Sequence, residues 1–339
     1  MPSSDFHTAI QQALTAYDLP QALVIEQPSR HNHVSVLLHT ATETLRCKIY
    51  SAIHTEQALL YEHDLLQQLA AQHLSFALPL PLQARDGATL QHSQYGWLAL
   101  LPYLPGILLD PEDLMQCAAL GSAIGELHQR LSLLRPVARP GHALFSSFFA
   151  FPPMERDPFT LTPTMIGAAE TAEADAICAW WRSNALALDC FLKERYQQLP
   201  MQLVHNDLAP YNVLVENGQL CAILDFEFAG LAARAFDLAM ALRMTMRVWE
   251  NPDPWTAAIQ LCKGYRRWAS LTEQECACMP QLILLRSCMG TLWSLGRGAP
   301  IDTTRFLQHL EFLRNAAIWL DQHGEQLVAL LMRELSGPA

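Results

Sequence analysis

A two-residue turn between two apolar runs constrains this chain more than any other feature. Asn217-Gly218 separates the run VLVE from the run QLCAIL. Both residues tolerate the positive φ angles of a tight hairpin turn, so the pair predicts a β-hairpin. The turn also sets the register, which places Asn212 opposite Ile223.

Polar residues gather at the open end of this predicted hairpin. Asp225 follows Ile223 by two residues, so it lies on the face of Asn212, and such diagonal neighbours are roughly 7–8 Å apart. Asp207 precedes Asn212 by five residues and falls at the same end. Carboxylate and amide oxygens suit Mg²⁺, whose other positions phosphate oxygens can fill. The spacing therefore predicts a magnesium and phosphate site.

Length and charge limit the remaining options. The 339 residues favour two lobes, and 51% hydrophobic against 16% charged residues indicates a folded chain. The formal charge, 22 − 33 = −11, argues against a nucleic-acid binder. It is compatible with a cationic substrate, although acidic proteins are common and the charge also serves solubility.

Targeting signals and metal-binding cysteine patterns are not evident. No apolar run reaches the ~20 residues of a membrane helix, and the start MPSSDFHTAIQQAL is unlike a secretion signal. The nine cysteines contain no CxxC pair. We therefore expect a cytoplasmic chain with reduced thiols, no structural zinc and no membrane partner.

The first hundred residues predict a small antiparallel sheet with a helix packed on it. The expected elements are a helix at 4–17, strands at 22–27, 33–39 and 44–50, a helix at 55–73, and strands within 88–93 and 95–101. The turn QPSRHNH between the first two strands has no glycine.

After PYLPG, at 102–106, the pattern becomes helical. Asp110-Pro111 predicts a helix start, with Asp as the cap, and the helix would end near 134. Residues 136–165 are rich in Pro, Phe and Gly and predict a loop or lid. Further helices are expected at 168–198, 235–249, 254–270, 279–296 and 302–335. The prediction is an α+β fold with a sheet lobe at 1–103 and a helical lobe at 104–339.

These segments resemble the protein-kinase-like superfamily over most of the chain. HNDLAPYN matches its catalytic-loop pattern H-x-D-x-x-x-x-N, and ILDFEFAG resembles its metal-binding Asp segment. With RAFDLA following, the arrangement resembles the aminoglycoside phosphotransferase, choline kinase and type II homoserine kinase branch. YLPG before GSAIGELHQRL is similar to that branch's connector and first large-lobe helix, and RHNHVSVLL and LRCKIY resemble its second and third strands.

The resemblance implies roles for the polar residues of the hairpin. Asp207 would accept or orient the substrate hydroxyl proton. Asn212 and Asp225 would hold Mg²⁺ on the phosphates of ATP. His205 would stiffen the catalytic loop, and Asp237 would anchor that loop by hydrogen bonds.

A strand lysine and its partner remain to be chosen. Lys48 matches the branch's phosphate-binding lysine in KIY, but alternation puts Arg46 on the same strand face. Glu62 on the following helix is the expected partner of Lys48, with Glu56 as the alternative. Arg234 belongs with Asp237 to the R-x-x-D-L-A segment as structural support.

Other residues fit the pattern more loosely. Backbone groups near Leu101 and Tyr103 would meet the adenine, and Asn32 resembles a position beneath the phosphates. Glu227 is either an extra metal ligand, a contact of the substrate or a solvated residue. Trp293, with Arg286 and Arg297, could line a substrate pocket, although such an apolar helix is more often core. His128 is interpreted as a packing histidine.

The resulting expectation is an ATP-dependent and Mg²⁺-dependent small-molecule kinase. The acceptor would be a hydroxyl on an amine-bearing molecule, such as a homoserine-like amino alcohol or an amino sugar. The alternatives are an antibiotic phosphotransferase of the aminoglycoside type and a nucleotide-binding pseudokinase. A protein kinase is disfavoured because only eleven residues separate Asp225 from Asp237, too few for a long activation segment.

Overall fold

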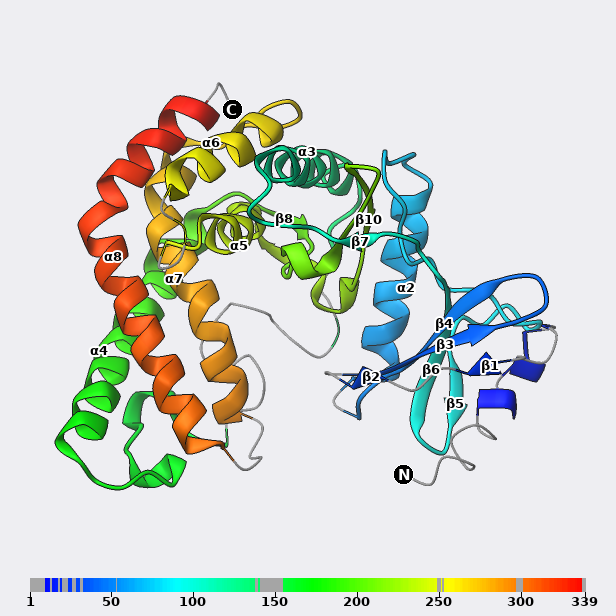
Figure 1. The fold of residues 1–339 in the computed structure, drawn as a ribbon, viewed down its shortest axis with the longest axis horizontal. Helices are drawn as coiled ribbons and strands as arrows, with labels where there is room; N and C mark the ends of the chain where they lie inside the picture. The colour runs from blue at the N-terminus through cyan, green and yellow to red at the C-terminus, as the bar shows by residue number, and fades with distance from the viewer. Residues whose placement is uncertain are drawn as a thin grey trace. The chain divides into compact units, whose positions relative to one another are not determined.

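The computed structural model of the chain divides into two compact units (Figure 1). The residues described are 10–12, 14–17, 19, 24–25, 29–30, 33–52, 54–137, 140, 155–248, 251, 253–296 and 301–336. The first unit contains the chain up to Ile107 together with Leu214–Glu216 and Cys221–Glu227. The second contains Leu108–Val213, Asn217–Leu220 and the chain from Phe228 onward. Two short segments from the hairpin region thus join the N-terminal unit.

An antiparallel sheet dominates the first unit. Its strands are β1 (Val24–Ile25), β2 (Ser29–Arg30), β3 (Val34–His39), β4 (Thr44–Ile49), β5 (Gln91–Ser93) and β6 (Gly96–Pro102). The order is β1-β3-β4-β6-β5, and β2 also pairs with β3. The predicted strands are present, while the short β2 lies in what the sequence predicted as a turn.

The two faces of this sheet pack on different helices. Leu45 and Cys47 share a core with Ile10 and Leu14, which belong to the helical residues described near the N-terminus. The opposite face packs on Leu59 of α2 (Glu56–Ala70), through Tyr50, Ala99 and Leu101. Side chains alternate along β4, so Lys48 lies on the face that α2 covers.

The predicted hairpin is confirmed. Strands β9 (Val213–Glu216) and β10 (Gln219–Ile223) flank the turn, in which Asn217 has φ 51° and Gly218 has φ 76°. These left-handed angles are those of a type I′ turn. β7 (Ile107–Leu108) extends the hairpin to three strands.

A second pair of strands brackets the polar segments and was not predicted. β8 (Met201–Val204) pairs antiparallel with β11 (Gly230–Ala233), with Val204 opposite Gly230. β8 therefore leads directly into the segment that begins at His205, and β11 follows the segment that ends at Ala229. Both strands have only four residues and are mostly apolar, which gives little alternation to recognise.

Helices make up most of the second unit. They are α3 (Leu114–Leu131), α4 (Ala172–Glu194), α5 (Ala235–Met246), α6 (Pro254–Tyr265), α7 (Glu273–Gly296) and α8 (Thr303–Leu335). The expected helices are present, although α7 begins at Glu273 and not at 279. The predicted cap of α3 is wrong, because Asp113 accepts the Met115 and Gln116 amides, while Asp110 accepts that of Glu112. Of the predicted loop, 141–154 lies outside the described residues. No described helix is both long and apolar enough to cross a membrane.

Two glycines allow α3 and α6 to approach closely. A Cβ at Gly121 would lie within 3.0 Å of the Leu261 carbonyl oxygen, and a Cβ at Gly264 equally close to that of Ala118. Any side chain at either position would therefore collide with backbone. The close packing fixes α3, which carries His128 on its buried side.

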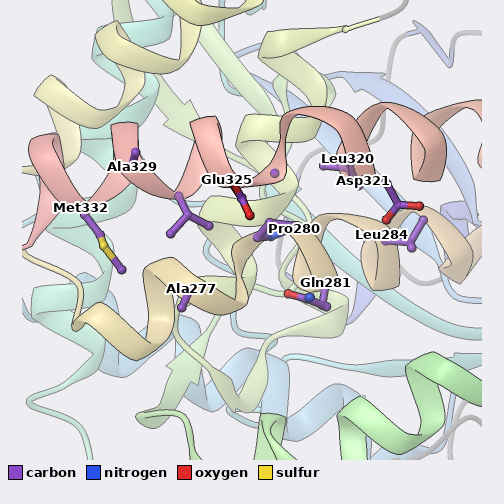
Figure 2. Close-up of a pocket in the computed structure, with 11 residues that line it drawn as sticks. Ala277, Pro280, Gln281, Leu284, Leu320, Asp321, Glu325, Ala329 and Met332 are labelled. Atoms are coloured by element: carbon purple, nitrogen blue, oxygen red, sulfur yellow. The ribbon is translucent and has the colours of Figure 1, made fainter.

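Helices α7 and α8 lie side by side and line an open cavity of about 480 Å³ (Figure 2). From α7, Ala277, Pro280, Gln281 and Leu284 line it. Two carboxylates, Asp321 and Glu325, reach it from α8 among apolar side chains. The α7 residues recur at three- and four-residue spacing, so the cavity occupies one stripe of that helix.

Candidate active site

The segment after β8 is held by one buried carboxylate. Asp237, in the first turn of α5, accepts the backbone amides of His205 at 2.9 Å and Asn206 at 2.7 Å. His128 Nε2 lies 3.1 Å from the same carboxylate, and its Nδ1 lies 3.1 Å from the Tyr265 hydroxyl. Burial raises the pKa of Asp237, but these hydrogen bonds and the neighbouring imidazoles bring it below its usual value. An ionised Asp237 therefore fixes the loop.

The loop presents Asp207 in a defined hydrogen-bond network. The Asp207 amide donates to His205 Nδ1 at 3.2 Å. Asn212 Nδ2 donates to Asp207 Oδ2 at 3.0 Å and to its carbonyl at 2.9 Å, and the Tyr211 hydroxyl donates to Oδ1 at 2.9 Å. Because the Asn212 amide nitrogen is used in this way, its oxygen is the atom that can ligate a cation. The Asp207 side chain is 13% exposed, so it can reach a ligand.

Two arginines adjoin Asp207. Arg286 of α7 donates through Nη2 to Asp207 Oδ1 in an ion pair. Arg243 of α5 donates through Nε to the Ser287 hydroxyl at 2.8 Å. The sequence singled out Arg286 only as a candidate pocket residue and missed Arg243 and Tyr211. A charged residue within a strongly apolar helix was the available signal for both arginines.

Arg286 belongs to a stripe of α7 that is distinct from the cavity stripe. Arg286, Gly290 and Trp293 follow at four- and three-residue spacing and share one side of the helix. Trp293 meets Phe228 edge to face, with ring centroids 6.3 Å apart. Gln281 and the other cavity residues of α7 project from the opposite side. The cavity in Figure 2 is therefore not formed by the side of α7 that carries Arg286.

Lys48 is surrounded by carboxylates within the first unit. Its ammonium lies 2.9 Å from Asp225 Oδ1 and 3.8 Å from Glu227 Oε2. Burial by itself lowers the pKa of Lys48, but Asp225, Glu62 and Glu227 together raise it well above its usual value. Lys48 is therefore charged, and it lies on the buried, α2-facing side of β4.

The alternatives to Lys48 and Glu62 have other surroundings. Arg46 donates to the Ser35 hydroxyl on the neighbouring strand at 2.8 Å. Glu56 is exposed in the first turn of α2, whereas Glu62 is buried on that helix. Of the two basic and two acidic candidates, Lys48 and Glu62 are the ones whose charges interact with each other.

Glu227 takes part in a buried network with two histidines. Its Oε2 pairs with His33 Nε2 and lies 3.7 Å from His54 Nε2. The Ser51 amide donates to His33 Nδ1 at 3.2 Å, so His33 carries its proton on Nε2 and donates it to Glu227. Although these groups lie close enough to hold a metal ion, the His33 tautomer and the ammonium of Lys48 favour a hydrogen-bond network instead.

Arg234 has a structural partner. Its Nε and Nη2 donate to the two oxygens of Glu275 on α7, each at 2.8 Å. Glu275 is fully buried, so this bidentate pair ties the start of α5 to α7. Asp237 lies one helical turn beyond it.

The remaining predicted residues are more peripheral. Leu101 is a buried residue of β6, paired with Arg46 across the sheet, and Tyr103, just beyond β6, is 40% exposed. Asn32 and Arg297 lie outside the described residues.

The geometry around Asp207 suits the deprotonation or orientation of a hydroxyl. Asp207 is held from its backbone and from both carboxylate oxygens, yet it remains accessible. A positioned carboxylate of this kind is a general base or an orienting group. Asp225 has φ 61° and a side chain that is 35% exposed, so it also remains accessible beside Lys48.

Known homoserine kinases are similar to this chain in sequence. The homoserine kinase of Rhizobium johnstonii is 27% identical over 253 residues, covering 73% of this chain and 71% of that one. The homoserine kinase of Beijerinckia indica is 25% identical and covers 81% of each chain.

Solved structures show the same protein-kinase-like fold. A microcompartment-associated aminopropanol kinase has a TM-score of 0.72 at 17% identity and covers 95% of this chain and 98% of its own. An amicoumacin kinase has a TM-score of 0.69 at 16% identity, covering 92% and 93%. A profile described as the phosphotransferase enzyme family matches residues 25–273, most of the length. The chain therefore belongs to the phosphotransferase enzyme family.

Proposed function

We propose that this phosphotransferase uses ATP and Mg²⁺ to phosphorylate a hydroxyl of an amine-bearing small molecule, of the homoserine or amino-alcohol type. The observation that carries the proposal is Asp207, held at both oxygens and at its backbone in a loop anchored by Asp237. The homoserine kinases and the aminopropanol kinase among the similar proteins support the acceptor class.

Asp207 would accept the acceptor's hydroxyl proton or orient that hydroxyl for attack on the γ-phosphorus. The oxygen–phosphorus bond forms as the bond to the ADP leaving group breaks, so no covalent enzyme intermediate is needed. Such a carboxylate contributes roughly 10²–10⁴-fold to the rate. His205 would act indirectly, by holding the Asp207 amide.

Asn212 and Asp225 would hold Mg²⁺, and Lys48 would contact the phosphates. Asn212 offers an amide oxygen and Asp225 a carboxylate oxygen, and these are the hard oxygen ligands that Mg²⁺ prefers. When bound, the ion neutralises charge that develops on the phosphoryl oxygens. Lys48, kept charged by its acidic neighbours, supplies a fixed positive group.

The other predicted contacts are retained as parts of this proposal. Leu101 and Tyr103 would offer backbone groups to the adenine, and Asn32 would lie beneath the phosphates. Glu62 would support Lys48 through its charge, for which the raised pKa of Lys48 is evidence. Trp293 would face the acceptor from the Arg286 stripe of α7.

The second candidate is an antibiotic phosphotransferase. It is favoured by the likeness to the amicoumacin kinase and to an aminoglycoside phosphotransferase from Alicyclobacillus acidocaldarius, whose TM-score is 0.62. A pseudokinase is disfavoured by the presence of Asp207, Asn212, Asp225 and Lys48.

A screen of ATP consumption tests the proposal. The purified chain with Mg²⁺ is given homoserine, aminopropanol, ethanolamine, choline and a set of aminoglycosides, each beside its amine-free alcohol where one exists. We expect ADP to form with at least one amino alcohol and at a lower rate with the matched neutral alcohol. Turnover of aminoglycosides alone would select the second candidate, and equal rates with neutral alcohols would contradict the amine-bearing class.

A further inference from the structure

The surroundings of Asp207 carry more positive than negative charge. Arg286 pairs with Asp207, and Arg243 is held to Ser287, the residue next to Arg286. One carboxylate, which pairs with Arg286, therefore stands near two guanidinium groups whose charges interact, and this leaves an excess of one positive charge. Among the described residues, Arg243 has no carboxylate within ion-pair distance.

Polar atoms in this region lack partners. The Nε–H of Arg286 is buried and donates to no oxygen among the described residues, and Nε2 of His309 on α8 is likewise buried without a hydrogen-bond partner among them. His309 lies against α7, since a Cβ at Gly290 would come 3.5 Å from its Nε2. Burial and then the neighbouring Arg286 lower the pKa of Arg243, as expected for like charges close together. Buried charges without partners are costly, so such a cluster needs an anion to complete it.

We propose that Arg286 and Arg243 bind a carboxylate of the acceptor, so that the substrate carries an acid group as well as its hydroxyl. This inference rests on the proposed function and narrows its substrate class from amino alcohols to hydroxy acids, with a hydroxy amino acid as the best fit. The planar guanidinium of an arginine binds a carboxylate through two parallel hydrogen bonds. The ammonium of a lysine side chain cannot form this bidentate contact.

The contacts of Arg286 indicate how the acceptor is coupled to Asp207. Arg286 now donates to Asp207 Oδ1, the oxygen that also receives the Tyr211 hydroxyl. A bound carboxylate would share or take over Arg286, which leaves Asp207 to the acceptor hydroxyl. An acceptor without the acid group would have no carboxylate to draw Arg286 away, so its hydroxyl would compete with Arg286 for Asp207.

The anion could instead be a phosphate group of the nucleotide. We favour the acceptor because Arg286 shares its helix stripe with Gly290 and Trp293, and because the proposed function already gives the phosphates Lys48 and Mg²⁺. The two sources predict different results, since a phosphate contact affects every acceptor equally.

Kinetics with matched acceptors separate these cases. Homoserine is compared with 3-aminopropanol and with γ-hydroxybutyrate, and serine with ethanolamine, in wild type, Arg286→Ala and Arg243→Gln. We expect wild type to prefer the acids by roughly 10- to 100-fold in kcat/KM, the value of a charge-assisted hydrogen-bond pair. Either variant should remove most of this preference, mainly through KM. γ-Hydroxybutyrate, which has the acid group but no amine, should depend on the two arginines in the same way. The exposed Arg305→Ala serves as the control that keeps the preference.

Binding provides a readout that does not depend on turnover. Calorimetric titration of the same acceptors, with Mg²⁺ and a non-hydrolysable ATP analogue, is run on wild type and on both variants after a melting check of their fold. Arg-dependent binding of the acids supports the inference even if no acceptor is phosphorylated, in which case only the proposed function fails. Equal affinity for acids and decarboxylated acceptors, or equal losses with both in the variants, would overturn it. If Arg286→Ala does not fold, Arg243→Gln decides alone.

Discussion

At the scale of single residues, the candidate site depends on charges that are kept ionised by their neighbours. Asp237 stays ionised because donors surround it, and Lys48 stays charged because carboxylates surround it. Each of these groups would be costly if its partners were removed, since an uncompensated buried charge is expensive. Substitutions at these positions therefore need a check of folding beside any activity measurement.

Replacing Lys48 by Ala should impair nucleotide use, while replacing Arg46 by Ala should have little effect. Lys48 faces Asp225 on the α2 side of β4, whereas Arg46 is engaged with Ser35. We expect the Michaelis constant for ATP to rise about tenfold or more in Lys48→Ala, the scale of a charge-assisted contact. Steady-state kinetics over a range of ATP concentrations measure this. The reverse order of the two variants would assign the phosphate contact to Arg46.

Asp225 should matter more than Asn212 for binding of nucleotide with Mg²⁺. A carboxylate brings a full negative charge to a hard cation, and an amide brings only a dipole. Titration of ATP with and without Mg²⁺ on Asp225→Ala and Asn212→Ala gives the metal-dependent part of each affinity. Losses of the same size in the two variants would show that this ranking of ligands is mistaken.

At the scale of elements, the packing of α2 on the sheet adds a pH dependence. His63 of α2 is buried between the Tyr50 hydroxyl at 3.1 Å and the Thr89 hydroxyl at 2.7 Å. Burial, and after it the charge of Lys48, lowers the pKa of His63 from 6.5 to about 4. The unfolded chain therefore binds this proton first, and stability is lost as the pH falls through that range.

The size of this loss can be measured by comparing wild type with His63→Gln, which keeps polar contacts but does not titrate. From pH 7 to pH 4, we expect the wild-type free energy of unfolding to fall by about 3 kcal/mol more than that of the variant. Urea unfolding at each pH supplies the values. Parallel pH curves for the two proteins would exclude His63 as the source.

The crossing of α3 and α6 should tolerate no side chain at its two glycines. Gly121→Ala and Gly264→Ala each drive a Cβ into the backbone of the other helix. We expect each to cost more than about 2 kcal/mol, because backbone cannot move aside as a flexible side chain can. Gly324→Ala in α8 is the control, since its Cβ would make only ordinary contacts with Pro280. Thermal melting compares the three, and equal stabilities would show that the helices can separate at little cost.

At the scale of the whole molecule, the sequence predicted what local rules determine. The hairpin at Asn217-Gly218 follows from backbone preference alone, and the long helices follow from periodicity. The cap of α3 was misplaced because Asp110 and Asp113 both have a carboxylate suited to capping, and only packing selects Asp113. β8 and β11 were missed because two four-residue strands carry little pattern.

The residues of the candidate site were also predictable only in part, because some of them are fixed by local spacing and others by tertiary packing. HNDLAPYN places Asp207 and Asn212 by fixed spacing along one segment. Arg286 reaches Asp207 from α7, and Arg243 of α5 is hydrogen-bonded to Ser287 beside it; no spacing rule connects either arginine to Asp207. Contacts of that kind are set by tertiary packing, so the sequence could name candidates but not their partners.

We propose that Asp207 serves phosphoryl transfer from ATP to a small-molecule hydroxyl. The most direct measurement is detection of the phosphorylated acceptor by mass spectrometry, with Mg²⁺ and ATP, for wild type, Asp207→Asn and the exposed control Asp64→Asn. We expect product from wild type and control, and a rate lower by roughly 10²–10⁴-fold in Asp207→Asn with ATP binding retained. Product formation by Asp207→Asn at nearly the wild-type rate would contradict it.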